Sequence, residues 1–303
     1  MVKRLESGSP EVKVAVTAAI KAAENAGEAI PFNDDSLRNL DTRTVFTTAE
    51  SVQTESGSAP AGVAVAWVTA DKTRLEAELF VHPEVRRQGL GARLTAALRN
   101  YASENKAALH LWAHGESEAA TAFLGALGAS RMRQLLKMST PLAGWASCSA
   151  DAHVDELEKS GFAVASFNYE RDASDWVALN SKVFADHPEQ GAVTLAALER
   201  YTQTDWFDAT AFFLVRQEGR LLAYAWLKLT SSEAELYVLG VAREIAGRGL
   251  GKKLVELAKA VAAERGYAEL TLYVEGDNAP ALRVYNSQNF APVWRDGLYL
   301  LSR

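Results

Sequence analysis

The chain has 303 residues, about twice the length of an average domain, with 48% hydrophobic and 23% charged residues, proportions that exclude a disordered or collagen-like chain. Its 32 Lys and Arg against 38 Asp and Glu give a formal net charge of −6, which argues against nucleic acid as a partner. Cys148 is the single cysteine, so an internal disulfide is excluded and a reducing cytoplasm is expected. No stretch approaches the roughly 20 apolar residues that span a bilayer. We expect a soluble, cytoplasmic protein without a membrane partner, and a monomer.

The first predicted element is a helix over residues 12–26, where apolar residues recur at helical spacing. Ser9 suits the position before the helix and Pro10 its first turn, while Gly27 suits its end. This helix precedes a series of elements that the chain contains twice.

Each copy has an alternating apolar strand, a glycine turn, a helical pattern and a second strand, in that order. In the first copy these lie at residues 77–81, 86–91, 90–98 and 108–112. In the second copy they lie at residues 234–238, 247–251, 250–261 and 270–274. Because strands and helices alternate, the sequence predicts a mixed α/β sheet with flanking helices. A repeat this long indicates two tandem domains rather than a solenoid. Between the copies, the stretch 141–161 is rich in turn residues. We therefore predict an N-terminal domain at 1–142, a linker at 143–162 and a C-terminal domain at 163–303.

Two common phosphate-binding motifs do not fit the glycine turns. A P-loop requires Ser or Thr after Gly-Lys to hold magnesium, but Lys253 stands there. The dinucleotide motif requires a third glycine, where Leu94 and Leu254 stand.

A third motif, the pyrophosphate loop of the GNAT acetyltransferases, is Gln/Arg-x-x-Gly-x-Gly/Ala. Residues 86–91 match it in full, and residues 246–251 match it except at Ala246. In such a loop, backbone N–H groups and the N-terminus of the following helix bind phosphate. A plain strand-to-helix turn is the alternative.

Four segments of the second half carry a more specific resemblance: residues 184–191, 206–208, 237–241 and 272–278. Through them the chain resembles the mycothiol synthases, a family of tandem GNAT N-acetyltransferases. The resemblance covers nearly all of residues 165–303 and is looser over the first half. It implies acetyl transfer from acetyl-CoA to the cysteinyl amine of 1D-myo-inositol 2-(L-cysteinylamino)-2-deoxy-glucopyranoside, the last step of mycothiol biosynthesis. Two alternatives stay open: another tandem GNAT enzyme that acetylates an aminoglycoside, a peptide N-terminus or a small amine, and a non-enzymatic acyl-CoA-binding module.

The resemblance places the general base at Glu235 and the general acid at Tyr285. An α-amino group has a pKa of about 7.7–8, so a carboxylate acting directly or through water is an adequate base. Proton transfer from a phenol to a thiolate is uphill by about 2 kcal/mol at their ordinary pKa values. We therefore expect a hydrogen bond that strengthens as the thiolate forms. A solvated glutamate and a core tyrosine are the alternatives.

The resemblance also implies contacts to acetyl-CoA and to the acceptor. Those to acetyl-CoA in the second half are Leu239, Gly240, Val241, Ala246, Gly247, Arg248, Gly249, Leu250, Gly251, Lys252, Asn278, Ala279, Pro280, Ala281, Leu282 and Arg283. Those in the first half are Leu79, Phe80, Val81, Arg87, Gln88, Gly89, Leu90, Gly91 and Ala92. Those to the sugar conjugate are Asp34, Glu189, Lys228, Glu235 and Tyr273. The histidines show no zinc-ligand spacing, and no metal is expected.

The first half departs from the catalytic pattern. Glu78 matches Glu235, but aligning Gly128-Ala129 with Asn289-Phe290 puts Leu124 opposite Tyr285. Leucine cannot donate a proton. We therefore expect the first half to bind acetyl-CoA without catalysing transfer.

Overall fold

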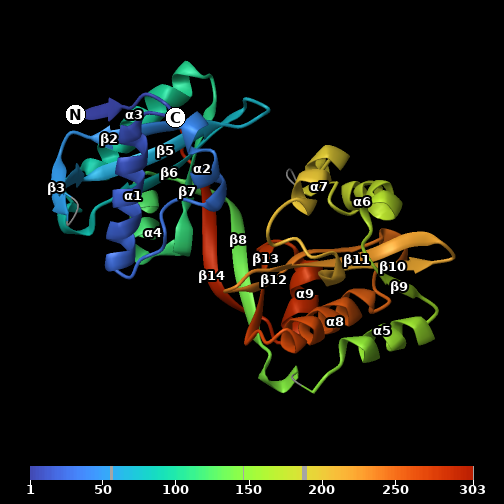
Figure 1. Cartoon of the computed structure of the whole chain (residues 1–303). Coiled ribbons are helices and arrows are strands. Elements are labelled where there is room, and N and C mark those ends of the chain that lie inside the picture. The colour runs from blue at the N-terminus through green and yellow to red at the C-terminus, as the bar shows by residue number, and fades with distance from the viewer. Residues whose placement is uncertain (55–56, 146, 186–189, 303) are drawn as a thin grey trace. The chain divides into compact units, whose positions relative to one another are not determined.

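The computed structural model of the chain describes residues 1–54, 57–145, 147–185 and 190–302 (Figure 1). The chain forms two compact units, residues 1–135 with 294–303 and residues 136–293. These units differ from the predicted domains in two respects. The end of the chain belongs to the first unit, and the predicted linker contains helix α5, which packs on α8 within the second unit.

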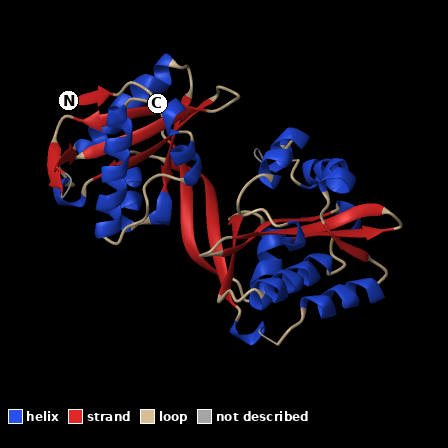
Figure 2. Cartoon of the chain, viewed as in Figure 1, coloured by secondary structure: helices blue, strands red, loops and turns tan. Residues whose placement is uncertain are grey.

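The first unit is a mixed sheet with helices on both faces (Figure 2). Its elements are β1 (Val2–Arg4), α1 (Pro10–Asn25), α2 (Asp34–Arg38), β2 (Thr44–Thr48), β3 (Ser51–Thr54), β4 (Gly57–Pro60), β5 (Gly62–Val68), β6 (Arg74–Val81), α3 (Leu90–Glu104), β7 (Ala108–Ala113), α4 (Glu118–Ala126) and the start of β8 (Ser130–Pro141). The sheet order is β1-β2-β5-β6-β7-β14, and β6 and β7 are parallel. Leu90, Leu94 and Leu98, which lie in the predicted helical pattern of residues 90–98, are buried in α3, so the helical period is confirmed.

The second unit has the same plan. Its elements are the end of β8, α5 (Ala150–Lys159), β9 (Ala163–Ser166), α6 (Tyr169–Val183), α7 (Leu195–Thr202), β10 (Phe212–Gln217), β11 (Arg220–Leu229), β12 (Ala234–Val241), α8 (Leu250–Glu264), β13 (Glu269–Glu275), α9 (Ala279–Ser287) and the start of β14 (Ala291–Leu300). The sheet order is β8-β13-β12-β11-β10-β9, and β12 and β13 are parallel. In the described part of the chain, no helix is long and apolar enough to cross a membrane.

Strands β8 and β14 explain why the units differ from the predicted domains. The end of β14 pairs with β7, with Leu298 opposite Trp112, and Leu298 is fully buried. The end of β8 lies in the second unit, where Met138 is fully buried in the core. The end of β14 therefore completes the sheet of the first unit, and the end of β8 completes the sheet of the second. The apolar side chains of each strand end are buried in the unit that the strand completes.

Candidate active site

Each unit has a glycine loop that opens directly into a helix. Gly89 precedes α3 with φ of 78°, and Gly249 precedes α8 with φ of 82°. Two residues earlier, Arg87 in the first loop and Gly247 in the second also have a left-handed backbone conformation. Glycine adopts this conformation without strain. Neither helix has an acidic residue in its first turn. The N–H groups and the positive end of each helix dipole are therefore suited to an anion such as the pyrophosphate of acetyl-CoA.

Arg86 shows why the second loop can have Ala246 at the same place. The Arg86 Nε donates to the carbonyl of Val81 at 3.0 Å, and its guanidinium pairs with Glu28 at 2.5 and 2.6 Å. This side chain braces the loop against the end of β6. The predicted phosphate contacts are backbone N–H groups, which alanine provides as well as arginine.

The parallel strands separate toward the glycine loop in both units. β6 and β7 pair up to Glu78, after which β6 continues to Val81. β12 and β13 pair at Glu235, and β12 continues to Val241. The separated backbone edges include the predicted acetyl-CoA contacts 79–81 and 239–241. In each unit a glutamate therefore stands where the strands separate.

Gly240 has a packing role within that edge. A Cβ at Gly240 would lie 2.4 to 2.6 Å from the ring of Tyr224. The Tyr224 hydroxyl donates to Asn180 Oδ1 at 2.7 Å, and burial holds the pKa of Tyr224 well above its usual value. The glycine lets β12 approach this fixed ring closely, which keeps the backbone of 239–241 in place.

Glu235 lies beside Lys228 on neighbouring strands, so two predicted acceptor contacts are brought together. The Lys228 Nζ is 4.0 Å from Glu235 Oε2, and it lies 5.6 Å from the ring centroid of Trp206. The Trp206 ring packs on Tyr237 at 5.2 Å. The Glu235 side chain is 11% exposed. This arrangement gives a carboxylate at the edge of an aromatic wall, within reach of solvent.

Sequence reasoning missed two charged residues next to this pair. Lys137, near the end of β8, has its Nζ 2.6 Å from Glu233 Oε1 and 5.6 Å from the ring centroid of Tyr273, a predicted acceptor contact. The Thr271 hydroxyl donates to the same Glu233 oxygen at 2.8 Å. Lys137 could not be found from the sequence pattern because its strand precedes the second copy of the repeat.

Tyr285 is buried on α9, with its ring 5.8 Å from that of Phe290. Burial raises the pKa of Tyr285 to about 12. Full transfer to a thiolate of pKa about 8.5 would then be uphill by about 5 kcal/mol, which favours a hydrogen-bonding role over proton transfer. Asn278 caps this helix, because its side chain accepts from the N–H of Ala281 at 3.1 Å.

Leu124 is the structural counterpart of Tyr285, as predicted. Gly128 and Asn289 both have left-handed backbones, with φ of 65° and 61°. The N–H of Ala129 donates to the carbonyl of Leu124 at 3.0 Å, and the N–H of Phe290 donates to the carbonyl of Tyr285 at 3.0 Å. Helices α4 and α9 therefore end in the same way, and the leucine occupies the place of the phenol.

One carboxylate oxygen of Glu78 has two partners within the first unit. Its Oε1 is 2.9 Å from the His114 Nε2 and accepts the N–H of Asn33 at 3.0 Å. The His114 Nδ1 lies 3.2 Å from Asp296. Burial opposes the positive charge of His114, but the hydrogen bonds with Asp296 and Glu78 outweigh it and raise its pKa to about 9. This carboxylate is fully buried in an ion-paired cluster.

The remaining predicted residues lie apart from these clusters or outside the described part of the chain. Asp34 is exposed in the first turn of α2. Glu189 falls in the segment 186–189, which the structure does not describe. Among the described residues, no group of three or more His, Cys, Asp or Glu side chains is arranged to hold a metal.

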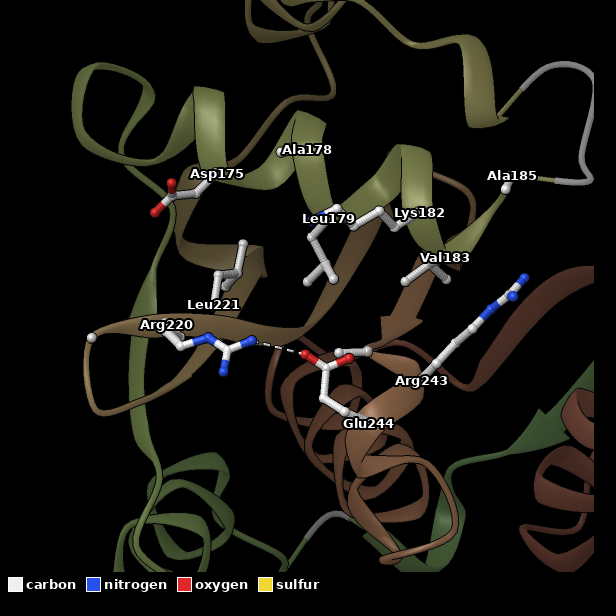
Figure 3. A pocket seen from close by; sticks show the side chains of 12 residues that line it. Asp175, Ala178, Leu179, Lys182, Val183, Ala185, Arg220, Leu221, Arg243 and Glu244 are labelled. Carbon is white, nitrogen blue, oxygen red and sulfur yellow. Dashed lines mark hydrogen bonds and ion pairs between the residues drawn. The ribbon is translucent and has the colours of Figure 1, made fainter.

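A pocket of about 670 Å³ in the second unit lies elsewhere (Figure 3). It is lined by α6 and by the segments around Arg220 and Glu244, whose side chains pair across it at 3.0 Å. No predicted catalytic or acetyl-CoA residue lines it, and we do not assign it to the acetyl-transfer site.

Comparison with known proteins agrees with this duplicated site. The family model described as Acetyltransferase (GNAT) family matches residues 176–290, and that described as Acetyltransferase (GNAT) domain matches residues 46–128. A protein of Clavibacter sepedonicus named mycothiol acetyltransferase is 41% identical over 76% of this chain and 73% of its own length. One of the same name from Thermobifida fusca is 34% identical over 96% of this chain and 95% of its own. The chain belongs to the mycothiol acetyltransferase family.

Solved structures support the tandem fold of this family member. A GCN5-related N-acetyltransferase from Sphaerobacter thermophilus has a TM-score of 0.72 at 17% identity, covering 100% of this chain and 96% of that one. A tandem GNAT protein of the clavulanic acid biosynthesis pathway has a TM-score of 0.69 at 18% identity, covering 100% and 99%. The predicted fold, two tandem GNAT domains with mixed sheets and flanking helices, is confirmed. The chain is an acetyltransferase.

Proposed function

We propose that this acetyltransferase moves an acetyl group from acetyl-CoA to the cysteinyl amine of 1D-myo-inositol 2-(L-cysteinylamino)-2-deoxy-glucopyranoside, which completes mycothiol. The observation that carries the proposal is the identity of 34–41% with relatives named mycothiol acetyltransferase. In this proposal the second unit catalyses the reaction, and the first binds acetyl-CoA without catalysing it. The enzyme acts as a monomer in the cytoplasm, without a metal.

The chain's own residues would bind and orient the acetyl donor. Acetyl-CoA supplies a thioester, whose acyl carbon the amine attacks. The loop 246–251 and the N-terminus of α8 bind the pyrophosphate through backbone N–H groups. The edge 239–241 holds the pantetheine arm where β12 and β13 separate, and an N–H there polarises the thioester carbonyl.

Two side chains would handle the proton and the leaving group. Glu235 first attracts the acceptor's ammonium and then accepts its proton, directly or through a water molecule. The amine nitrogen forms the new bond to the acyl carbon while the carbon–sulfur bond breaks. Tyr285 donates a hydrogen bond to the departing sulfur. The nitrogen loses its second proton to water as the amide forms, and the thiolate takes a proton from water to leave as the thiol of CoA. The support for these roles is the position of Glu235 at the separation of the strands, beside Lys228 at 4.0 Å.

The test is a CoA-release assay with the cysteinyl conjugate, L-cysteinamide and an aminoglycoside as parallel acceptors. We expect the conjugate to give the highest kcat/KM, and mass spectrometry to place the acetyl group on nitrogen. Glu235→Gln serves as the blank for contaminating activity. Turnover of the simpler amines with none of the conjugate would overturn the assignment of substrate. Failure to turn over any acceptor, with acetyl-CoA still bound, would favour a binding module.

A further inference from the structure

Lys137 and Glu233 form an ion pair on the same face of the sheet as Glu235. Glu233 directly precedes β12, and its Oε1 accepts from the hydroxyl of Thr271, the residue that pairs with Glu235 across the parallel strands. The Lys137 ammonium lies beside the ring of Tyr273, which is 45% exposed. Strand β8 therefore adds a cation next to the predicted acceptor residues.

The charges on this face form two ion pairs, in which the lysines are similarly exposed and the carboxylate of the second pair is less accessible than that of the first. One pair, Lys137 and Glu233, is 25% and 37% exposed at 2.6 Å. The other, Lys228 and Glu235, is 27% and 11% exposed at 4.0 Å. Burial opposes the charge of Lys137, but its hydrogen bond to Glu233 and the nearby Tyr273 and Glu235 raise its pKa. The surface therefore offers an open, charged end next to Tyr273 and a more enclosed end at Glu235.

This arrangement suits hydroxyl groups, each of which both donates and accepts hydrogen bonds. A lysine ammonium has three N–H donors, so the contact with Glu233 does not exhaust it. A partly exposed aromatic ring beside the pair offers an apolar face on which the C–H groups of a sugar ring can pack.

In the first unit the cations beside the equivalent residues are arginines from other positions. The Arg74 Nη2 lies 3.6 Å from Glu76 Oε1, and the Arg133 guanidinium lies 5.7 Å from the ring centroid of Trp112. Glu76 corresponds to Glu233 and accepts from the indole N–H of Trp112 at 2.9 Å, and Trp112 corresponds to Tyr273. The offset that aligns Gly128 with Asn289 puts Leu298 opposite Lys137, and Leu298 is fully buried. The aromatic ring and the carboxylate are thus common to both units. The lysine belongs to the unit with Glu235 and Tyr285.

We propose that Lys137 and Glu233, with the ring of Tyr273, bind hydroxyl groups of the sugar part of the acceptor. The inference rests on the proposed function and deepens it, because it assigns the end of the acceptor that is not acetylated. Lys137 is then a specificity residue supplied by the strand that ends the first half of the sequence.

The test compares Lys137→Ala with the parent enzyme, using the cysteinyl conjugate as acceptor and the cysteine-free glucosaminyl-inositol as competitive inhibitor. We expect the KM for the conjugate and the Ki of the inhibitor each to rise tenfold or more, the loss typical of a charged hydrogen bond. The kcat and the KM for acetyl-CoA should change by less than about twofold. Lys137→Arg should recover most of the affinity.

A matched control is Arg220→Ala, which removes an ion pair with Glu244 on the same unit, away from this surface. It should leave both acceptor constants unchanged. If Lys137→Ala is too unstable to assay, Lys137→Gln gives the same comparison. Unchanged KM and Ki would overturn the proposal. So would a general loss of function, in which kcat falls and the affinity for acetyl-CoA weakens as much as the affinity for the acceptor. A parent enzyme that does not use the conjugate would instead refute the proposed function.

Discussion

The two units place a glutamate at the same point of the same fold, and they treat it differently. Glu78 has no exposed surface, and it is held by His114 and the N–H of Asn33. Glu235 is partly accessible, with Lys228 at 4.0 Å. A base must be able to exchange its partner for the substrate's ammonium, and a carboxylate inside a buried ion pair can do so only at a cost of several kcal/mol. We therefore expect that Glu78 does not act as a base, although it has the same residue type as Glu235.

The second difference concerns the hydroxyl group of Tyr285. Tyr285 and Leu124 follow the same helical register and the same left-handed helix end, yet only one carries a hydroxyl. The glycine loops, by contrast, have the same geometry in both units. The comparison predicts two sites that bind acetyl-CoA and one that turns it over.

The largest effect should come from placing a charge in each loop. Gly249→Glu adds a carboxylate beside the expected pyrophosphate, and two like charges about 4 Å apart repel by roughly 4 kcal/mol at an effective dielectric of 20. Binding there should weaken about a thousandfold and turnover nearly cease. Gly89→Glu should leave substantial turnover and remove at most one bound acetyl-CoA. Calorimetry counts the bound molecules, and CoA release measures turnover.

The alanine variants are the control for backbone strain in this pair. Both glycines have similar positive φ, and no described atom lies within 4 Å of the Cβ position at either. Gly89→Ala and Gly249→Ala should therefore cost similar stability without the electrostatic effect. Loss of activity in a folded Gly89→Glu protein would contradict the assignment of catalysis to the second unit.

Removing the carboxylates should separate catalysis from stability. Glu235→Gln should lower kcat by roughly 10²- to 10⁴-fold, the range for a general base, with little change in the unfolding temperature. Glu78→Gln should keep kcat but destabilise the protein by about 1–3 kcal/mol, because it removes one of the two carboxylates that pair with His114, while Asp296 remains. Chemical denaturation and steady-state kinetics on the same preparations measure both. A large fall in kcat for a folded Glu78→Gln protein would show that the first unit also takes part.

Tyr285→Phe removes one hydroxyl and should lower kcat by roughly 10²-fold, with little change in acetyl-CoA affinity. Because burial raises the pKa of Tyr285 to about 12, the hydroxyl stays protonated across the working range, and the size of the effect should not depend on pH between 7 and about 10. The matched variant in the first unit, Leu124→Met, should leave kcat unchanged. Full activity of Tyr285→Phe, with chemistry limiting the rate, would make Tyr285 a core residue only.

The smallest effect is a pH dependence of stability from the first unit. The folded pKa of His114 is raised to about 9 from 6.5, so its contribution is complete below about pH 6.5 and is lost as the pH rises through about 9. The contribution of His114 to the free energy of unfolding is about 3 kcal/mol at most. The groups facing His114 are Glu78 and Asp296, and Asp296, whose pKa is lowered, acts in the acidic range instead. Denaturation between pH 6 and 10 measures the slope, which His114→Gln should remove.

Much of the backbone around the predicted active site could be predicted from local sequence. The loops, the caps at Gly89, Gly249 and Asn278, and the correspondence of Leu124 with Tyr285 follow from short-range rules of backbone conformation. The family resemblance supplied the roles of Glu235 and Tyr285, which no periodicity indicates. What could not be predicted is the cluster around Glu78, because its members come from α2, β6, β14 and the end of β7.

The sequence by itself determined that the chain has two tandem GNAT domains, because each glycine loop is contiguous and its residue types are read directly. The family resemblance added the prediction that only the second domain has both an acid and a base. The tertiary structure decided which strand completes each sheet, since that depends on where Leu298 and Met138 bury their side chains. It also decided that Lys137 lies beside Glu233 and that Glu78 lies beside His114. Contacts between residues far apart in the chain are fixed by packing and by the pairing of buried charge, and no local pattern records them.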